Sequence, residues 1–160
     1  MRISSPYRAL SAVRRVELVT HAITANRDAR LVYVQRMIAR GGGFRAVTLQ
    51  SWPPERLARE VVRLNAESAQ DELELLQLLY VDLEPGIQTT FLDAAGVQHE
   101  QGKIAEALEP PYASAAGVHR GATAVRDAHG EDGMLYLRTI ARYSNEAWPD
   151  IDSVLAELGG

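Results

Sequence analysis

Three polar residues, Asn65, Ser68 and Glu72, follow one another at steps of three and four residues on the otherwise apolar face of a predicted helix. Steps of three and four residues place side chains above one another on one helix face. Because buried polar groups need hydrogen-bonding partners, this line is a candidate site. A functional interpretation makes it the wall of a ligand pocket, with Glu72 as an acid, a base or a ligand. The interpretation that we prefer is structural: a charge pair with another helix, or a half-covered face.

A second candidate is the ionisable segment that begins at His99. It starts like the zinc-protease motif His-Glu-x-x-His, in which one helical turn brings two histidines to the same metal. Lys103 stands in place of the second histidine and Gly102 weakens a helix, so this motif is rejected. What remains is a charged loop between helices, made of His99, Glu100, Lys103, Glu106 and Glu109. Such loops carry function or are solvated connectors, and we prefer the second interpretation.

Other chemistries find little support in the residue types present. The chain has no cysteine, which excludes disulfides and thiolate metal sites. No Glu-x-x-His pair of a helical carboxylate metal site occurs, and no serine lies on a nucleophile elbow. The sequence therefore predicts neither a metal nor a cofactor, and an enzyme is not the favoured class. The four histidines are His21, His99, His119 and His129.

Charge is divided unequally along the chain. Residues 1–63 hold twelve arginines and four acidic residues, whereas residues 64–160 hold five basic and seventeen acidic residues. An arginine-rich half is typical of nucleic-acid binding. The arginines are nevertheless spread through amphipathic segments and form no dense patch. We therefore expect the basic half to contact the acidic half, within one chain or between two copies, and we do not favour a nucleic-acid partner.

The element that must position the first candidate site is a long amphipathic helix, predicted over residues 54–83. Pro53 and Pro54 suit its start, because a first-turn proline loses no helical hydrogen bond. Charged residues, Glu67 among them, fall on the opposite side. One face of this helix should therefore be buried. Its apolar residues recur with the helical period: Leu57, Ala58, Val61, Val62, Leu64, Ala69, Leu73, Leu75, Leu76, Leu79, Tyr80 and Leu83.

A second helical segment is predicted over residues 6–39, as one helix or as two collinear ones with a break near Asn26. Arg27 and Arg30 interrupt its apolar stripe, and Glu72 is their candidate ion-pair partner. Leu18, Val32 and Tyr33 face away from that stripe and give the segment a second apolar surface. This surface predicts a twofold dimer through the N-terminal helix, or a helix folded back on its own domain. Gly41, Gly42 and Gly43 are expected to form a linker.

The other segments complete an all-α prediction. Residues 44–52 are expected to form an extended loop because Pro53 disfavours helix before it. Short helices are expected over residues 87–95, with Gly96 as the stop, and for one or two turns around residues 104–108. Ser114 and Asp132 should cap two further helices, the first ending at Gly130, and Asp150 should cap the last. The predicted fold is a single-domain bundle of about six helices around residues 54–83.

Length and composition place this chain among ordinary globular proteins. Its 160 residues suffice for one domain with a core. The first ten residues lack a signal-peptide core and no apolar run approaches the length of about 18 residues that spans a membrane, so a soluble cytoplasmic protein is expected. The favoured function is an interaction or oligomerising module that forms a homodimer. The alternatives are a small-molecule-binding protein or enzyme, which would use the 65–72 line or the 99–106 loop, and a nucleic-acid binder.

Overall fold

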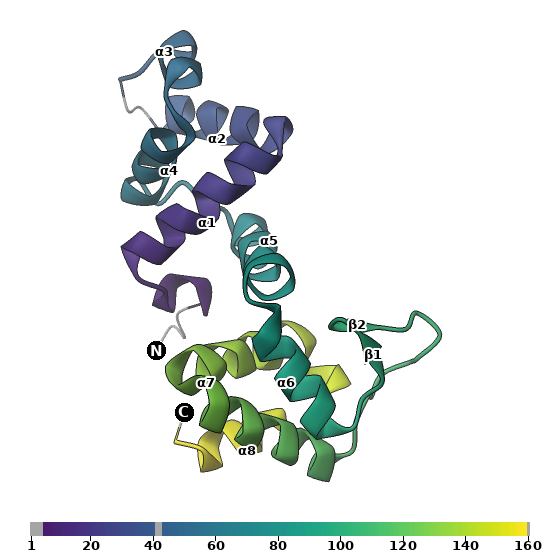
Figure 1. Ribbon diagram of the computed structural model, residues 1–160. Helices are drawn as coiled ribbons and strands as arrows, with labels where there is room; N and C mark the ends of the chain where they lie inside the picture. Colours follow the sequence, from purple (N-terminus) through teal and green to yellow (C-terminus); the bar gives the residue numbers. More distant parts are fainter. Residues whose placement is uncertain (1–4, 41–42, 160) are drawn as a thin grey trace. The chain divides into compact units, whose positions relative to one another are not determined.

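The computed structural model describes residues 5–40 and 43–159, and helices dominate it (Figure 1). This confirms the all-α prediction. The chain divides into two compact units, residues 1–78 and residues 79–160, and each unit is described by itself below. None of the helices among the described residues is long and apolar enough to cross a membrane.

The first unit is organised around helix α1, which packs on α4 and also contacts α2 and α5. Leu18 and Val19 of α1 meet Leu57 and Val61 of α4 in its core, and all four are fully buried. A 3-10 turn precedes α1. In chain order the elements are η1 (Tyr7–Ala9), α1 (Ala12–Ala25), α2 (Arg27–Ala39), α3 (Ala46–Ser51), α4 (Pro54–Arg63) and α5 (Ala69–Leu78).

The 54–83 segment buries its apolar side, but it is not one continuous helix as predicted. Helix α4 ends at Arg63, and Asn65 adopts a left-handed conformation with φ of 49°. Ser68 and Asp71 then start α5 by a reciprocal cap: the Asp71 amide donates to Ser68 Oγ at 3.2 Å and the Ser68 amide donates to Asp71 Oδ2 at 2.8 Å. This is a capping box with Asp in place of Glu. This cap starts a new helix at a point where the hydrophobic period predicted a continuous one.

The predicted break at Asn26 is confirmed. Asn26 has extended backbone, and its Oδ1 accepts hydrogen bonds from the amides of Asp28 at 2.9 Å and Ala29 at 3.3 Å. The chain turns there, so α1 and α2 contact each other and are not collinear (Figure 1). Of the predicted second apolar surface, Leu18 and Tyr33 are buried within the first unit, at 0% and 4% exposed, whereas Val32 is 40% exposed. Of the two predicted ways to cover this surface, packing within the chain applies to Leu18 and Tyr33. A turn at Asn26 lets a segment bury two faces that one straight helix would expose.

Residues 44–52 were expected to be extended, and this prediction is wrong because α3 forms there. Arg30 explains how so short a helix is held. Its guanidinium donates to the carbonyl of Gln50 at 2.7 Å and to that of Trp52 at 2.5 Å, where α3 ends. Of the predicted glycine linker, Gly41 and Gly42 lie outside the described residues, and Gly43 has φ of 77°.

The second unit is built on the packing of α6 against α7. Phe91 of α6 is fully buried, with ring centroids 5.8 Å from Tyr136 and 4.9 Å from Trp148. A Cβ atom on Gly121 of α7 would lie 2.9 Å from the Phe91 ring, so glycine permits this approach. The elements are a π-helix η2 (Leu79–Leu83), α6 (Pro85–Ala95), β1 (His99–Glu100), β2 (Lys103–Ile104), α7 (Ala115–Ser144), η3 (Asn145–Ala147) and α8 (Ile151–Glu157).

Helix limits in this unit were partly predicted. Gly96 ends α6 with φ of 79°, and Ser114 caps α7 by accepting the Gly117 amide at 3.1 Å, both as expected. Gly130 interrupts α7 with φ of 57° and ψ of −130°, so this range holds two helices joined at a kink, which confirms the predicted stop at Gly130. The second helix starts directly after Gly130, close to the predicted cap Asp132. Asp150 precedes α8 without a side-chain capping bond. The turns predicted around residues 104–108 are also wrong, because a β-hairpin and an irregular segment replace them.

Candidate functional site

The polar line of the first unit is organised by Arg8, which lies about sixty residues away in sequence. Arg8 Nε contacts Glu72 Oε1 at 2.7 Å, and Arg8 Nη1 donates to Asn65 Oδ1 at 2.9 Å. The structure therefore brings Asn65 and Glu72 together on the Arg8 guanidinium. Ser68 belongs to the cap of α5. The predicted partners of Glu72, Arg27 and Arg30, are wrong, because η1 reaches the carboxylate and Arg30 binds carbonyls of residues 50 and 52.

Sequence reasoning missed the most buried carboxylate, Glu67, which is 4% exposed. The Tyr7 hydroxyl donates to Glu67 Oε2 at 2.5 Å, and Arg8 Nη1 lies 3.7 Å from Oε1. Burial raises the pKa of Tyr7 far above its usual range, and the bond to Glu67 adds to this rise. Burial and the charge of Glu67 also raise the pKa of Tyr33 to about 12. Both tyrosines therefore remain neutral, and the Tyr7 hydroxyl is the donor to this carboxylate.

The sequence analysis predicted Glu67 on the exposed side, because a continuous helix over residues 54–83 would point its side chain into water. The break between α4 and α5 changes the helical phase and turns the side chain inward. The same break frees backbone carbonyls, and three arginines bind them. Arg40 donates to the Leu64 carbonyl at 3.0 Å, Arg36 to Ala66 at 3.5 Å and Arg8 to Glu67 at 3.0 Å.

Arg36 also forms an ion pair with Asp71, which is 9% exposed. Together with Arg8 on Glu67 and Glu72, this pair joins η1 and α2 to the start of α5. Much of the basic character of the first unit is therefore neutralised inside that unit. The 65–72 line is a structural network that holds a broken helix.

We expect Arg8→Met to lower the free energy of unfolding by about 2–3 kcal/mol, because Glu67 and Glu72 then lose their counter-ion while Glu67 stays buried. The matched control is Arg63→Met, which removes an exposed pair with Glu60 and should cost less than about 0.5 kcal/mol. Urea unfolding followed by far-ultraviolet circular dichroism measures both. Equal decreases in the free energy of unfolding for the two variants would contradict a structural role for Arg8.

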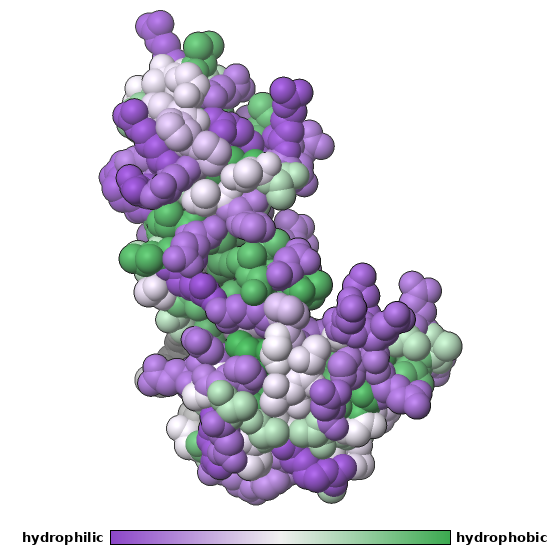
Figure 2. All heavy atoms as spheres, in the orientation of Figure 1, coloured by the Kyte–Doolittle hydropathy of each residue, from purple (hydrophilic) through white to green (hydrophobic). Residues whose placement is uncertain are grey.

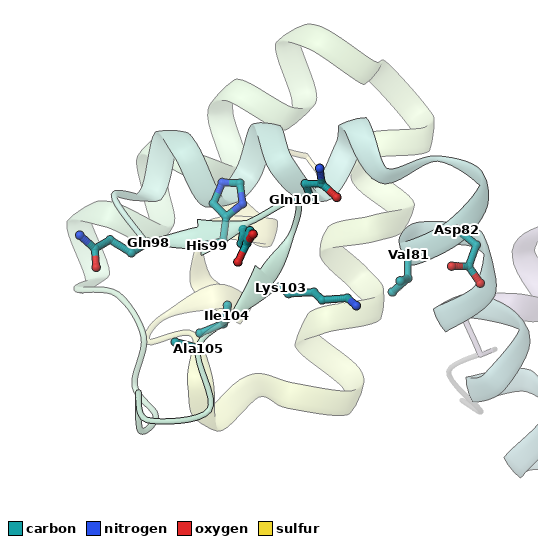
Figure 3. Close-up of a pocket in the computed structure, with 9 residues that line it drawn as sticks. Val81, Asp82, Gln98, His99, Gln101, Lys103, Ile104 and Ala105 are labelled. Carbon is teal, nitrogen blue, oxygen red and sulfur yellow. The ribbon is translucent and has the colours of Figure 1, made fainter.

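The second candidate site is a groove of about 930 Å³ beside the β-hairpin. The strands pair His99 with Ile104 and Glu100 with Lys103, and Gln101 and Gly102 form the turn with φ of 51° and 87°. Figure 3 shows the Lys103 side chain directed towards Val81 and Asp82 of the π-helix. The groove thus gathers His99, Glu100 and Lys103, which lie on the strands of the hairpin. Its lining is Val81, Asp82, Gln98, His99, Glu100, Gln101, Lys103, Ile104 and Ala105.

His99 has a structural task in the hairpin. Its Nδ1 accepts the Gly102 amide at 2.9 Å, and its Nε2 lies 2.6 Å from Asp93 Oδ1. A backbone N–H can only donate, so Nδ1 is unprotonated and Nε2 carries the hydrogen that Asp93 accepts. With both nitrogens bound, His99 cannot ligate a metal without breaking one of these bonds. Gln88 secures the turn further by donating to the Gly102 carbonyl at 2.6 Å.

The remaining charged groups of this loop face solvent. Glu100, Lys103, Glu106 and Glu109 are exposed and have no ion pair with any described residue. Two other histidines have separate partners: His119 contacts Glu157 at 3.3 Å and His129 contacts Thr90 at 3.2 Å. Within residues 5–40 and 43–159, no three metal-ligating side chains gather. The groove therefore offers a polar surface but no assembled catalytic group.

The third candidate site, which sequence reasoning missed, is a mainly apolar groove of about 690 Å³ along α1 and the start of α4. Val13 lies in it and is 71% exposed. The Thr20 and Thr24 hydroxyls donate to carbonyls one turn earlier, both at 2.7 Å, so neither needs another partner. Figure 2 shows hydrophobic side chains at the surface over α1. The groove is lined by Ala12, Val13, Val16, Glu17, Thr20, His21, Thr24, Glu55 and Arg59.

The sequence did contain a sign of this groove, because its lining residues recur every four positions from Ala12 to Thr24. The helical period alone does not determine which of the two apolar faces of α1 is covered by α4. The structure covers Leu18, Val19 and Ile23 and leaves Val13 exposed. Comparison with known proteins adds no assignment, since no family model, curated protein or solved structure matches the chain. Function is therefore inferred from the structure of the described residues.

Proposed function

We propose that the chain is an interaction module that forms a twofold dimer through the α1–α4 groove. The exposure of Val13 in an apolar groove carries this proposal, because such a groove gains free energy when a second surface covers it. The groove follows α1 from Ala12 to Thr24, about 18 Å at the helical rise of about 1.5 Å per residue. This length suits a helix laid along it, and α1 of a second copy has the same apolar lining.

This proposal differs in one respect from the sequence prediction of a dimer. Leu18 and Tyr33 were expected at the interface, but both are buried within the first unit. The surface that supports self-association is instead the opposite face of α1. A cytoplasmic location remains part of the proposal.

The two alternative functions have weaker support. Nucleic-acid binding has weak support because many arginines of the first unit already have partners within the protein, which reduces the free basic surface. Ion pairs involve Arg8, Arg36, Arg59 and Arg63, and backbone carbonyls bind Arg30 and Arg40. For an enzyme or a small-molecule site, the hairpin groove supplies exposed Asp82, Glu100 and Lys103, but His99 has both nitrogens occupied.

We expect Val13→Glu to weaken the dimer at least about 100-fold. A buried valine contributes about 1.5–3 kcal/mol, and the substitution removes one valine from each of the two copies. Each tenfold change in the dissociation constant corresponds to about 1.4 kcal/mol. Sedimentation equilibrium measures the dissociation constant against the monomer mass of 17.6 kDa. The control is Leu31→Glu, which places the same charge at a 40% exposed site on α2, outside the groove.

The control variant should dimerise as the unaltered chain does. If the unaltered chain sediments as a monomer up to about 100 μM, a range in which weak specific dimers still form, the dimer is wrong. If Leu31→Glu disrupts it as strongly as Val13→Glu, the groove is not the interface.

A further inference from the structure

Two arginines of the first unit contact Trp52, and two more lie next to the groups that surround it. The Arg56 guanidinium lies 4.2 Å from the centre of the Trp52 ring, and Phe44 meets the same ring edge-on at 4.8 Å. Arg45 follows Phe44 and immediately precedes α3, while Arg27 begins α2 one turn before Arg30, which binds the Trp52 carbonyl. We call the exposed arginines Arg27, Arg45 and Arg56 the basic corner.

The basic corner is available for a partner. None of its three arginines forms an ion pair with a described residue, in contrast to Arg59 and Arg63 on the same side of α4. Of nearby carboxylates, Glu55 is bound to Arg59, and Asp28 lies beside Arg27. Val47 of α3 is 79% exposed, the largest value among the large hydrophobic residues that remain exposed in the described structure. The corner therefore carries positive charge without an ion pair among the described residues, and the exposed Val47 lies two residues after Arg45 in the chain.

The second unit carries a segment with the complementary chemistry. Residues 105–109, Ala-Glu-Ala-Leu-Glu, form a turn in which the Leu108 amide donates to the Ala105 carbonyl at 3.0 Å. Every residue of this acidic turn is exposed, and Leu108 is 43% exposed between Glu106 and Glu109. Figure 1 shows that the segment after β2 runs away from α6 and α7 before it returns to α7.

Other exposed apolar residues of the second unit lack this combination. Tyr143 lies beside Arg142, whose guanidinium is 5.7 Å from the tyrosine ring. Val81 lies in the hairpin groove on a π-helix and has one exposed acidic neighbour, Asp82. Leu108 alone among these three has unpaired carboxylates on both sides. The acidic turn is thus the best match to the basic corner among the described residues.

We propose that the acidic turn of one copy docks on the basic corner of a second copy. Glu106 and Glu109 meet the guanidinium groups, and Leu108 covers Val47. This inference rests on the dimer proposed above and names a further contact in it. Because the dimer is twofold, the contact occurs twice, with each copy supplying one corner and one turn. Complementary surface charge of this kind guides association and specifies the partner.

Two charge-reversed chains test this contact. In the first, Arg27→Glu and Arg45→Glu invert the corner and leave the stacked Arg56 in place. In the second, Glu106→Arg and Glu109→Arg invert the turn. Each chain alone should dimerise about tenfold more weakly at low salt, since two like-charged contacts replace two attractive ones, and added salt should reduce the difference.

An equimolar mixture of the two chains should recover the affinity of the unaltered protein. In the mixed dimer the reversed corner of one chain meets the reversed turn of the other, and the unaltered corner meets the unaltered turn. Sedimentation equilibrium with one chain fluorescently labelled measures this mixed dimer. A contact within one chain cannot recover on mixing, so recovery identifies the second copy as the occupant. The control for net charge, Arg120→Glu with Arg138→Glu, alters two exposed arginines of the second unit and should leave affinity within about twofold.

Unchanged affinity in both reversed chains, or no recovery on mixing, would overturn the contact. If Val13→Glu still disrupts the dimer in that case, the proposed function stands and only this contact is wrong. A monomeric unaltered chain would overturn both proposals together.

Discussion

Leu18→Glu is expected to unfold the first unit. Leu18 is 0% exposed on α1, the helix that packs on α4. Loss of the leucine burial costs about 1.5–3 kcal/mol, and an unpaired buried charge costs several more. Domains are stabilised by about 5–15 kcal/mol in total, so this one substitution removes most of that margin.

The matched control for this prediction is Val32→Glu on the neighbouring helix, where the side chain is 40% exposed. It should change the free energy of unfolding by less than about 0.5–1 kcal/mol. The two tryptophans allow a local measurement, because Trp52 lies in the first unit and Trp148 in the second. In a Trp148→Phe background, urea unfolding followed by fluorescence reports on Trp52. A folded Leu18→Glu variant with a normal transition would contradict the assigned core.

The same pair of fluorophores tests the sequence prediction of a single domain. If the chain is one cooperative domain, the transitions reported by Trp52 and by Trp148 coincide in the unaltered protein. Leu18→Glu then shifts both transitions together. Separate transitions would show that the two units unfold independently.

Phe91→Ala is expected to cost about 3–5 kcal/mol in the second unit, the range typical of a buried aromatic residue truncated to alanine. Phe91 joins α6 to Tyr136 of α7 and to Trp148 after it. Gly121 brings the α7 backbone against the same ring, so the surrounding atoms have little freedom to close the cavity. Loss of this one side chain therefore removes contacts to most of the aromatic core of the unit.

The control for Phe91→Ala is Tyr143→Ala, which truncates an aromatic residue of α7 that is 37% exposed. Its cost should remain below about 1 kcal/mol. In a Trp52→Phe background, Trp148 fluorescence and far-ultraviolet circular dichroism follow the unfolding by urea. Similar midpoints for the two variants would show that Phe91 does not organise the core of this unit.

Local signals in the sequence determined the helical class and several helix limits. Ser114 starts α7, Gly96 ends α6 and Asn26 separates α1 from α2, because each of these groups bonds to backbone within a few residues. The apolar period also identified which side of residues 54–83 is buried. Such features depend on neighbours in the chain, so propensity and spacing are sufficient to predict them.

Tertiary structure decided the partners of the polar groups and the surfaces left uncovered. Arg8 reaches Glu72 and Asn65, and Tyr7 reaches Glu67, across about sixty residues of chain. These choices depended on the break between α4 and α5, which rotates Glu67 inward, and on the turn at Asn26, which buries Leu18 and leaves Val13 exposed. Periodicity shows that a helix has apolar faces, but only the packing of other helices determines which face is covered.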